Sequence, residues 1–563
     1  MEMLKRSLAP TGFLGDSVKG AALEGLVCAT AACGFLLFGY DQGIMSGIIT
    51  ETNFLTYFPK MDPDNKMGAI QALVVAIYEI GCLFGSIFII GYGDQLGRRR
   101  AVLLGVIIML IGTAIQASSF EIGQLIVGRI VTGVGNGMNT SSIPVWQSEM
   151  APPKIRGFLV LFEGALIAGG IMISYWINYG FFFVTQYGSF QWRFPIAFQA
   201  VFAMILFFGV MALPESPRWL LKHDQDDVAI EILCRLKKAG PNDPEIKAEI
   251  AHIKKVKEIT DGKKLTLKEF YSNGPEMNRW RVTVGSASQL FQQIGGTNLV
   301  TYYATTVFES SLGFSPALSR LLTACYGTLY LAAAVVALFI VDRFGRRKMM
   351  IVGSVGMGTS ALIIGACLSQ TTDTYKAPAY AATVFIFVFI AFFALGWLGT
   401  TWLYPAEVTP IRIRAEANGV STSFNWLGNY AVVQLAPIMI YSISWKTYFV
   451  FMCFNYAFIP IIYYTFVETK GYPLETLDSI FEEAYNKKEN PVFTEMRLRK
   501  EGKQLDVEIR KEREKDGNGV SSESEGGVVM SEGDGVDGDV DDVEGLRSSR
   551  PYYKTVDEGL ADE

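Results

Sequence analysis

The sequence predicts an all-α integral membrane protein with twelve transmembrane helices in two pseudo-symmetric six-helix bundles. The composition favours the membrane class, because 50% of the 563 residues are hydrophobic and only 18% are charged. Apolar runs of about 20 residues, the length needed to cross roughly 30 Å of hydrocarbon, recur along the chain. Two charged motifs each occur once in either half of the chain, which favours a two-fold internal repeat.

The apolar runs define the predicted spans, and the connections between them define the topology. No cleavage site of a secretory signal precedes the first run, so we expect this run to remain as an insertion signal. Basic residues fall in alternate connections, which places these connections and both termini on the cytoplasmic side. The spans are expected at residues 24–48, 68–92, 101–118, 123–145, 157–183, 193–213, 280–308, 316–341, 349–369, 379–404, 417–440 and 447–467.

Five segments are expected from these spans. Residues 24–214 and 280–470 form the two bundles, and residues 215–279 form a cytoplasmic helical linker that could also serve as a docking platform. A cytoplasmic tail, 1–23, precedes the first bundle. The final segment, 471–563, is expected to be a cytoplasmic acidic tail that is mostly disordered, because its composition cannot bury a core.

Two repeated motifs place charges at the cytoplasmic ends of the spans. One is an aspartate followed by a Gly-Arg-Arg turn, and the other is a glutamate followed seven residues later by an arginine. We interpret these charges as a cytoplasmic gate whose ion pairs separate when the bundles move apart; the alternative is that they act only as topology determinants and helix caps. The gate residues are Asp94, Arg98, Glu149, Arg156, Asp342, Arg346, Glu407 and Arg414.

Charged residues also occur inside the spans, where a charge is expected to be functional or paired. Asp41 lies deep in the first span, and Arg129 lies among glycines in the fourth. We expect Arg129 to pair with Asp41, with Glu79 and Glu163 as rival partners. Asp41 could instead cap a helix break. For Glu79 the default role is a structural hydrogen bond between helices.

The stretch from Gln289 to Tyr303 concentrates amide and tyrosine side chains in a segment otherwise apolar enough for a membrane. Amides in hydrocarbon must find hydrogen-bond partners in other helices, water or a polar ligand, and a polyhydroxylated ligand suits them. The glycines at 295 and 296 allow a close approach. Asn425 and Asn429 lie one helical turn apart, near tryptophans whose faces can stack on a sugar ring. These residues predict a sugar site, although aromatic residues in spans more often face lipid.

Several function classes are disfavoured. The only histidines, His223 and His252, lie in the linker, and no phosphate-binding loop motif occurs. The seven cysteines do not form a disulfide framework. We therefore expect no enzyme, no cofactor, no metal site, no nucleic-acid partner and no ATP-driven pump.

Four motifs together carry a family resemblance. They are the repeated Asp-x-x-Gly-Arg-Arg turn, Pro-Glu-Ser-Pro-Arg-Trp-Leu at 214–220, Gln-Gln-x-x-Gly-x-Asn at 292–298 and Glu-Thr-Lys-Gly at 468–471. With them, residues 25–485 resemble the sugar porter family of the major facilitator superfamily, and its fungal members most. The resemblance implies the major facilitator fold.

The resemblance also implies roles for individual residues. Asp41 and Arg129 match the proton-coupling pair of proton-coupled relatives. Two departures from the family pattern stand out: Gly164 replaces a sugar-binding glutamine, and the eighth span lacks its usual asparagine. The implied substrate-binding residues are Gln292, Gln293, Asn298, Trp402, Asn425, Trp426 and Asn429.

We therefore expect a transporter that takes up monosaccharides, namely glucose and also xylose or other hexoses and pentoses, across a fungal plasma membrane. The expected mechanism is proton symport with alternating access, and the partners are the sugar, the proton and the lipid bilayer. The alternatives are a facilitative sugar uniporter, a polyol or glycerol–proton symporter, and a non-transporting sugar sensor. The second is considered because the Glu163-Gly164 pair and the sequence around it resemble fungal glycerol and polyol symporters. The sequence does not predict the preferred sugar or the oligomeric state.

Overall fold

The computed structural model describes residues 10–12, 17–62, 68–151, 156–260, 270–372, 375–410, 412–472 and 474–502. The contacts divide the chain into two units, Met1–Lys470 and Gly471–Glu563. Every predicted span lies in the first unit. The second contains α21 (Leu474–Lys487), where Glu483 pairs with Arg497 at 2.8 Å. The predicted disorder of the acidic tail falls largely outside the described residues.

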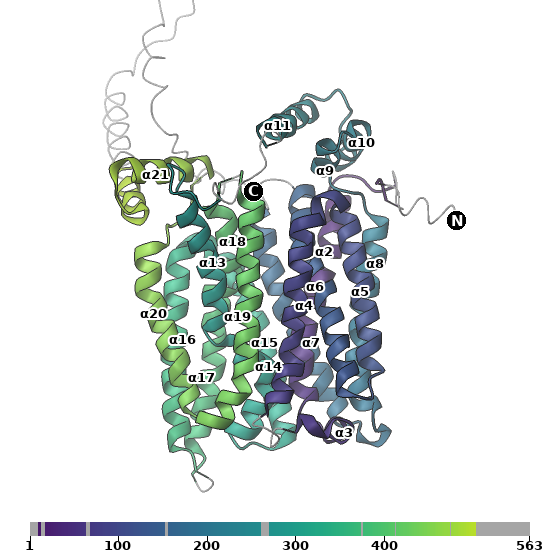
Figure 1. Ribbon diagram of the computed structural model, residues 1–563, viewed down its shortest axis with the longest axis vertical. Coiled ribbons are helices and arrows are strands. Elements are labelled where there is room, and N and C mark those ends of the chain that lie inside the picture. The colour runs from purple at the N-terminus through teal and green to yellow at the C-terminus, as the bar shows by residue number, and fades with distance from the viewer. Residues whose placement is uncertain are drawn as a thin grey trace, which may run out of the picture. The chain divides into compact units, whose positions relative to one another are not determined.

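Six long helices form the N-terminal bundle, drawn from purple to blue in Figure 1. Their bounds match the predicted spans closely. A short helix, α3 (Thr52–Tyr57), and a 3-10 turn, η2 (Pro59–Met61), follow the first of them. The six are α2 (Ala21–Ile48), α4 (Ala69–Leu96), α5 (Arg98–Ala117), α6 (Ile122–Met150), α7 (Arg156–Phe182) and α8 (Phe190–Ala212).

The C-terminal bundle lies beside the first, and two of its six spans are interrupted. The seventh span divides into α13 and α14 and ends in a π-helical turn, η6. The tenth divides into α17, the π-helical turn η7 and α18. The elements are α13 (Asn278–Ile294), α14 (Thr297–Thr306), η6 (Val307–Ser311), α15 (Pro316–Phe344), α16 (Arg346–Gln370), α17 (Ala377–Phe393), η7 (Ala394–Leu398), α18 (Gly399–Val408), α19 (Arg414–Ile443) and α20 (Lys446–Thr465).

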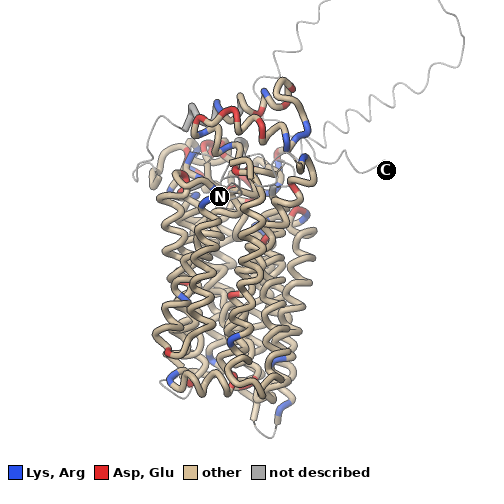
Figure 2. The backbone as a smooth tube through the Cα atoms, turned by 90° about the vertical axis from the view of Figure 1, so that its right-hand side faces the viewer, with Lys and Arg blue, Asp and Glu red and all other residues tan. Residues whose placement is uncertain are grey.

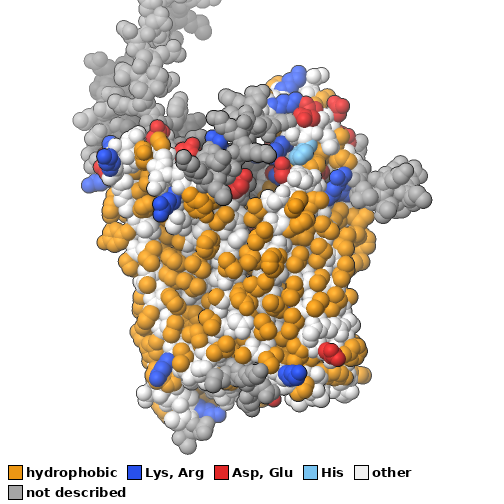
Figure 3. Space-filling model, viewed as in Figure 1, with side chains coloured by type: hydrophobic (Ala, Val, Ile, Leu, Met, Phe, Trp, Pro, Cys, Tyr) orange, Lys and Arg blue, Asp and Glu red, His pale blue; other side chains and the backbone are white. Residues whose placement is uncertain are grey.

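In the described residues, ten helical stretches are long and apolar enough to cross a membrane. The other two predicted spans are α6, which carries many polar residues, and the broken pair α13 and α14. Charged residues gather toward the two ends of the bundles in Figure 2, and the helices in Figure 3 expose mainly hydrophobic side chains between those ends. The prediction of twelve spans in an all-helical membrane protein is confirmed.

Gly296 explains the break in the seventh span. Its φ of 97° lies in the left-handed region that favours glycine. A Cβ atom there would lie 2.5 Å from Cδ1 of Phe451, so the packed ring also requires glycine. The break frees α14 to take its own direction and places Asn298 directly after it.

We call the end of the bundles that bears the α2–α4 connection the outer end, and the opposite end the inner end. The linker that joins the two bundles in sequence contains three helices, and they lie at the inner end (Figure 1). They are α9 (Pro217–Lys222), α10 (Asp226–Lys237) and α11 (Pro244–Thr260). The side chain of Ser216 caps α9 by accepting a hydrogen bond from the Trp219 backbone N–H at 3.2 Å.

Glycines allow α4 and α6 to pack with their backbones in contact. A Cβ atom on Gly85 would lie 2.1 Å from the carbonyl oxygen of Val134, and one on Gly137 would lie 2.0 Å from that of Cys82. Backbone cannot yield as the end of a flexible side chain can, so these positions exclude any larger residue. The close packing carries Arg129 on α6 toward α4 and α2.

We expect Gly85→Ala to destabilise the protein by about 1–3 kcal/mol, because the added methyl group must push α4 away from α6. Gly91→Ala is the matched control on the same helix, since a Cβ atom at Gly91 would meet nothing within 4 Å. Thermal unfolding of the detergent-solubilised variants measures both effects. Equal melting temperatures for the two variants would contradict the packing.

Candidate functional site

The amides of α13 and α19 form a hydrogen-bonded network inside the C-terminal bundle. Asn425 Nδ2 donates to Gln289 Oε1 at 2.6 Å and to Gln292 Oε1 at 3.0 Å. Gln289 Nε2 donates to the Thr401 carbonyl of α18 at 3.2 Å, and Gln292 Nε2 donates to the Trp397 carbonyl of η7 at 3.1 Å. The network therefore joins three of the spans of this bundle.

Asn298 extends the network across the break to α14. Its Nδ2 donates to Gln293 Oε1 and, at 2.7 Å, to Asn429 Oδ1. Gln293 in turn donates to Gln292 Oε1 at 3.2 Å. Asn429 Nδ2 makes no hydrogen bond with a described residue, so a buried donor is left over. All five predicted amides are thus buried and brought together, and none faces lipid.

The two predicted tryptophans occupy different environments. Trp426 is fully buried, donates from Nε1 to Ser86 Oγ of α4 at 2.9 Å and packs edge-on against Phe38 of α2 at 5.6 Å between ring centroids. Trp426 therefore reaches from the C-terminal bundle into the N-terminal bundle. Trp402 is half-buried on α18, next to Thr401, and no described ring contact or hydrogen bond of its side chain joins it to the amides.

Asp41 and Arg129 face each other in the N-terminal bundle, and both are fully buried. Arg129 Nη1 lies 3.7 Å from Asp41 Oδ1. Nη2 donates to the Val75 carbonyl at 3.1 Å, and the guanidinium carbon lies 4.5 Å from the centre of the Tyr78 ring. The predicted pairing of Arg129 with Asp41 is present in this arrangement. At 3.7 Å it is a loose ion pair rather than a short hydrogen bond.

Glu79 and Glu163, the two other carboxylates considered as partners of Arg129, lie in different surroundings. Glu79 lies on α4 and accepts a hydrogen bond at Oε1 from the Tyr302 hydroxyl of α14, which connects the two bundles. Glu163 is buried on α7 without a hydrogen bond or ion pair to another described residue. A Cβ atom on its neighbour, Gly164, would lie 3.4 Å from Leu398 Cγ, so position 164 faces the C-terminal bundle.

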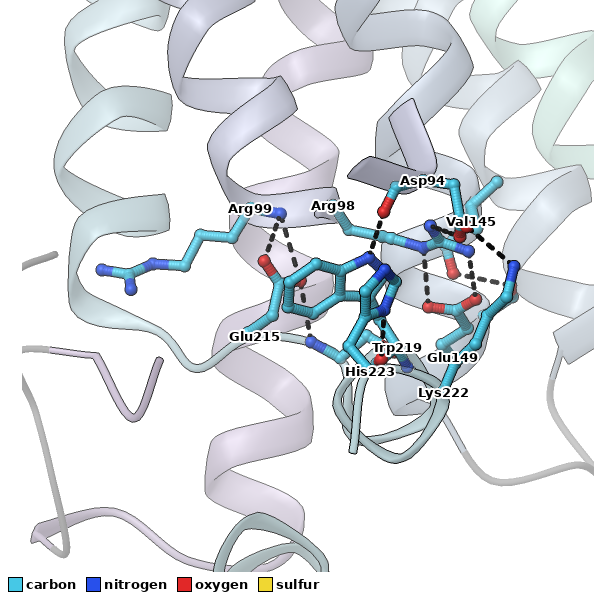
Figure 4. Close-up of polar contacts among 11 residues, drawn as sticks. Asp94, Arg98, Arg99, Val145, Glu149, Glu215, Trp219, Lys222 and His223 are labelled. Atoms are coloured by element: carbon cyan, nitrogen blue, oxygen red, sulfur yellow. Dashed lines mark hydrogen bonds and ion pairs between the residues drawn. The ribbon is translucent and has the colours of Figure 1, made fainter. Parts of the chain in front are cut away.

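At the inner end of the N-terminal bundle, Arg98 and Glu149 form a two-pronged ion pair, with both N–O distances at 3.1 Å (Figure 4). Arg98 also lies 3.5 Å from Asp94, which pairs with Lys222 of α9 at 2.8 Å. The Trp219 indole donates to the Asp94 carbonyl at 2.6 Å. The predicted gate residues of this bundle are therefore tied to the linker helix as well as to one another.

The carboxylate of Glu215 binds the backbone of the Gly-Arg-Arg turn. Its carboxylate accepts from the backbone N–H groups of Arg99, at 3.1 Å, and Ser216, at 2.9 Å (Figure 4). Burial raises the pKa of Glu215, and these two backbone hydrogen bonds oppose that rise. Gly97 has a φ of 85°, in the left-handed region that favours glycine. The Pro-Glu-Ser-Pro-Arg motif therefore serves as a support for the turn at the start of α5.

The C-terminal bundle repeats this construction. Arg346 pairs with Glu407 and with Asp342, both at 2.9 Å, and Glu468 accepts from the Arg346 backbone N–H at 2.9 Å. Arg414 donates to the Thr409 carbonyl at 3.1 Å, whereas the side chain of Arg156 lies outside the described residues. Among the described residues, the ion pairs of Arg98 and Arg346 each lie within one bundle, and the Asp94–Lys222 pair joins the N-terminal bundle to the linker helix α9.

Polar contacts join the bundles at the outer end. Arg320 of α15 donates to Thr50 Oγ1 at 2.7 Å and lies 3.6 Å from Glu309. The Thr305 backbone N–H donates to Ser46 Oγ of α2 at 3.4 Å. Glu51, beside this contact, is only 2% exposed, and neither of its oxygens has a hydrogen-bond partner among the described residues. These contacts close the outer end.

Three features of the site are not predicted by the sequence. Gln289 is absent from the binding residues that the resemblance implies, although it lies one turn before Gln292 and Gln293 on the same face of α13. The sequence marks Tyr302 only as a tyrosine in a polar stretch. The acceptor carbonyl of Trp397 depends on the π-helical turn η7, for which the sequence offers no clear signal.

A family model described as "Sugar (and other) transporter" matches residues 27–481, more than half of the chain. The chain belongs to this transporter family. Membership makes it a multi-pass membrane transporter of the major facilitator superfamily rather than an enzyme, and it confirms the resemblance seen in the motifs.

Individual members of the sugar transporter family agree with this assignment. The "Sugar transporter STL1" of Saccharomyces cerevisiae is 39% identical over 474 residues, 83% of this chain and 82% of that protein. "Hexose transporter 2" of Kluyveromyces lactis is 31% identical, over 81% of this chain and 82% of that protein. Among solved structures, the proton:xylose symporter XylE bound to 6-bromo-6-deoxy-D-glucose is 25% identical, with a TM-score of 0.70, and the match covers 82% of this chain and 100% of that chain.

The closed outer end gives this transporter a pH-dependent stability. Burial raises the pKa of Glu51 from its ordinary 4.5 to about 8, and Arg320 opposes that rise. The folded protein therefore holds a proton on Glu51 that the unfolded chain has lost between these two values. We expect the melting temperature to fall as the pH rises from 4.5 to about 8, and Glu51→Gln to flatten this fall.

Glu121→Gln is the control, because Glu121 is an exposed carboxylate at the same end. Its melting curve should keep the wild-type dependence on pH. A Glu51→Gln protein whose melting temperature follows pH as steeply as that of the wild type would show that Glu51 is not the titrating group.

Proposed function

We propose that this transporter takes up monosaccharides, glucose first and also xylose and other hexoses or pentoses, by proton symport with alternating access. The observation that carries the proposal is the buried amide network of the C-terminal bundle, which lies next to a buried carboxylate–guanidinium pair. The names of the yeast relatives support a sugar as substrate, and the likeness to XylE, a proton:xylose symporter, supports proton coupling.

The amides suit hydroxyl groups because each carries donors and an acceptor. Without a ligand they satisfy one another through Gln292, Gln293 and Asn425. A sugar can replace these internal hydrogen bonds by bonds of the same kind, so that entry costs little desolvation, and the spare donor of Asn429 adds a contact. The Trp426 ring would supply an apolar face for the sugar ring.

Proton coupling would run through Asp41 and Arg129. In this proposal Asp41 takes a proton from the outside, the ion pair with Arg129 is lost, and the sugar-loaded bundles rock toward the inner-open state. The loose 3.7 Å contact suits a pair that must break in each cycle. Linkage then requires that the proton and the sugar favour each other's binding by the same factor.

Alternating access would use the contacts at both ends of the bundles. The contacts of Arg320 and Ser46 would open and close the outer end. The ion-pair groups around Arg98 and Arg346 would hold each inner end rigid while the bundles move as units. We place the inner end and both termini in the cytoplasm, and the protein in the plasma membrane.

We expect Asn425→Ala to raise the KM for the transported sugar about tenfold, since it removes a side chain that bonds two glutamines and would bond the substrate. Gln199→Ala is the matched control, because Gln199 is a buried amide of α8 whose side chain makes no hydrogen bond with a described residue. Radiolabelled uptake in transporter-null yeast measures both variants. A KM for Asn425→Ala equal to that of the control would remove Asn425 from the binding site.

A panel of hexoses, pentoses and glycerol, tested with and without a protonophore, distinguishes the proposal from its alternatives. Symport predicts uptake against a gradient that the protonophore abolishes, and a medium that becomes more alkaline when sugar is added. A uniporter would give neither effect, a polyol symporter would prefer glycerol, and a sensor would give no uptake at all.

In the same cells, Asp41→Asn should abolish accumulation, because its amide cannot carry the proton. Exchange of labelled for unlabelled sugar needs no net proton movement and should persist at a measurable rate. Accumulation by Asp41→Asn at the wild-type level would exclude Asp41 from the coupling step.

A further inference from the structure

A second carboxylate, Glu79, lies in the same buried cluster as Asp41 and Arg129. It is fully buried on α4, one turn after Val75, whose carbonyl accepts from Arg129. Its Oε1 accepts from Tyr302, and its Oε2 has no hydrogen-bond partner in the described part of the chain. Arg129 and Asp41 both lie close enough to interact with Glu79 electrostatically.

The charges of this cluster do not balance unless a proton is bound. Two carboxylates share one guanidinium, and the other titratable groups that face them are neutral in their ordinary forms. These groups are Tyr78 and Cys82 on α4 and Tyr302 and Tyr303 on α14. An excess buried negative charge is costly in a low-dielectric interior. A single proton on either carboxylate makes the cluster neutral.

Glu79 also lies beside the amide network. Its partner Tyr302 lies one helical turn after Asn298, on the same face of α14. Asn298 donates a hydrogen bond to Asn429, and Asn429 lies near Glu79. The charge of Arg129 thus acts on Glu79, Glu79 lies beside Tyr302 and Asn429, and Asn429 is hydrogen-bonded to Asn298.

We propose that Asp41 and Glu79 share one proton and one guanidinium, and that Glu79 is the positioning residue that transmits the location of the proton to the sugar-binding amides. This inference rests on the proposed symport. While Glu79 is charged, it accepts from Tyr302 and attracts the spare N–H of Asn429. When the proton that Asp41 took from the outside passes to Glu79, that N–H is released to bind a sugar hydroxyl, and Arg129 pairs with Asp41 again.

The reverse linkage follows from the same contacts. A sugar that occupies the amide N–H of Asn429 removes a nearby hydrogen-bond donor from a charged Glu79, which makes the protonated form more favourable. Sugar binding therefore holds the proton in the cluster during the inward movement. Release of the sugar returns the Asn429 donor to Glu79 and favours release of the proton.

The test uses the full-length protein in liposomes, with D-glucose as the first probe and the preferred substrate of the uptake panel thereafter. Glu79→Gln keeps an acceptor for Tyr302 but cannot gain or lose a proton. We expect accumulation driven by a pH gradient to fall roughly tenfold, within the usual range of such couplings. Exchange should lose most of its dependence on pH, and Glu79→Asp should restore part of that dependence.

Tyr302→Phe tests the connection separately, because it leaves both carboxylates in place. Its KM for sugar should become less sensitive to pH than that of the wild type. Tyr448→Phe is the matched control, since Tyr448 is a buried tyrosine of α20 whose hydroxyl makes no hydrogen bond with a described residue. Tyr448→Phe should keep the wild-type pH profile.

The outcomes separate this inference from the proposed function. A wild-type protein that moves sugar without protons would overturn both. A wild-type protein that couples the two, together with a Glu79→Gln variant that has the same accumulation and pH profile, would overturn only the role of Glu79. Should Glu79→Gln fail to fold, wild-type pH profiles in Glu79→Asp and Tyr302→Phe would overturn that role equally.

Discussion

The fully buried guanidinium of Arg129 constrains the N-terminal bundle. A cation at this depth must be compensated at once by charge, by carbonyl oxygens and by aromatic faces. Asp41, the Val75 carbonyl and the Tyr78 ring supply the three kinds of compensation, from α2 and α4. The glycine contacts between α4 and α6 are what allow these groups to approach Arg129 closely enough. The close packing of the helices in this bundle and the compensation of its buried charge therefore depend on the same contacts.

The C-terminal bundle must also satisfy buried polar groups, and there the groups are neutral amides. Its amides are buried, so they bond to one another and to carbonyls that the interrupted helix around η7 leaves available. Such a network is stable without a ligand and still offers donors and acceptors to one. The Asp41–Arg129 pair of one bundle and the amide network of the other are built from residues that the two halves of the repeat do not share.

Periodicity and composition predicted the fold because a membrane imposes length and polarity on each span separately. The amides could be grouped from sequence because Gln292, Gln293 and Asn298 lie in one otherwise apolar segment, while Asn425 and Asn429 lie one helical turn apart in another. The contact between Glu79 and Tyr302 could not, because it joins residues 223 positions apart and depends on the break at Gly296. The partners of Arg98 and Arg346 needed the structure for the same reason: sequence places charges at an end, but the turn geometry selects which of them meet.

The break at Gly296 has a consequence for the timing of conformational change. Asn298, Tyr302 and Thr305 lie on one short rod, α14, which touches the amides, the carboxylate cluster and α2 in turn. A reorientation of α14 about this break would alter all three contacts at once, so the amides, the buried carboxylates and the outer end would switch together rather than one after another.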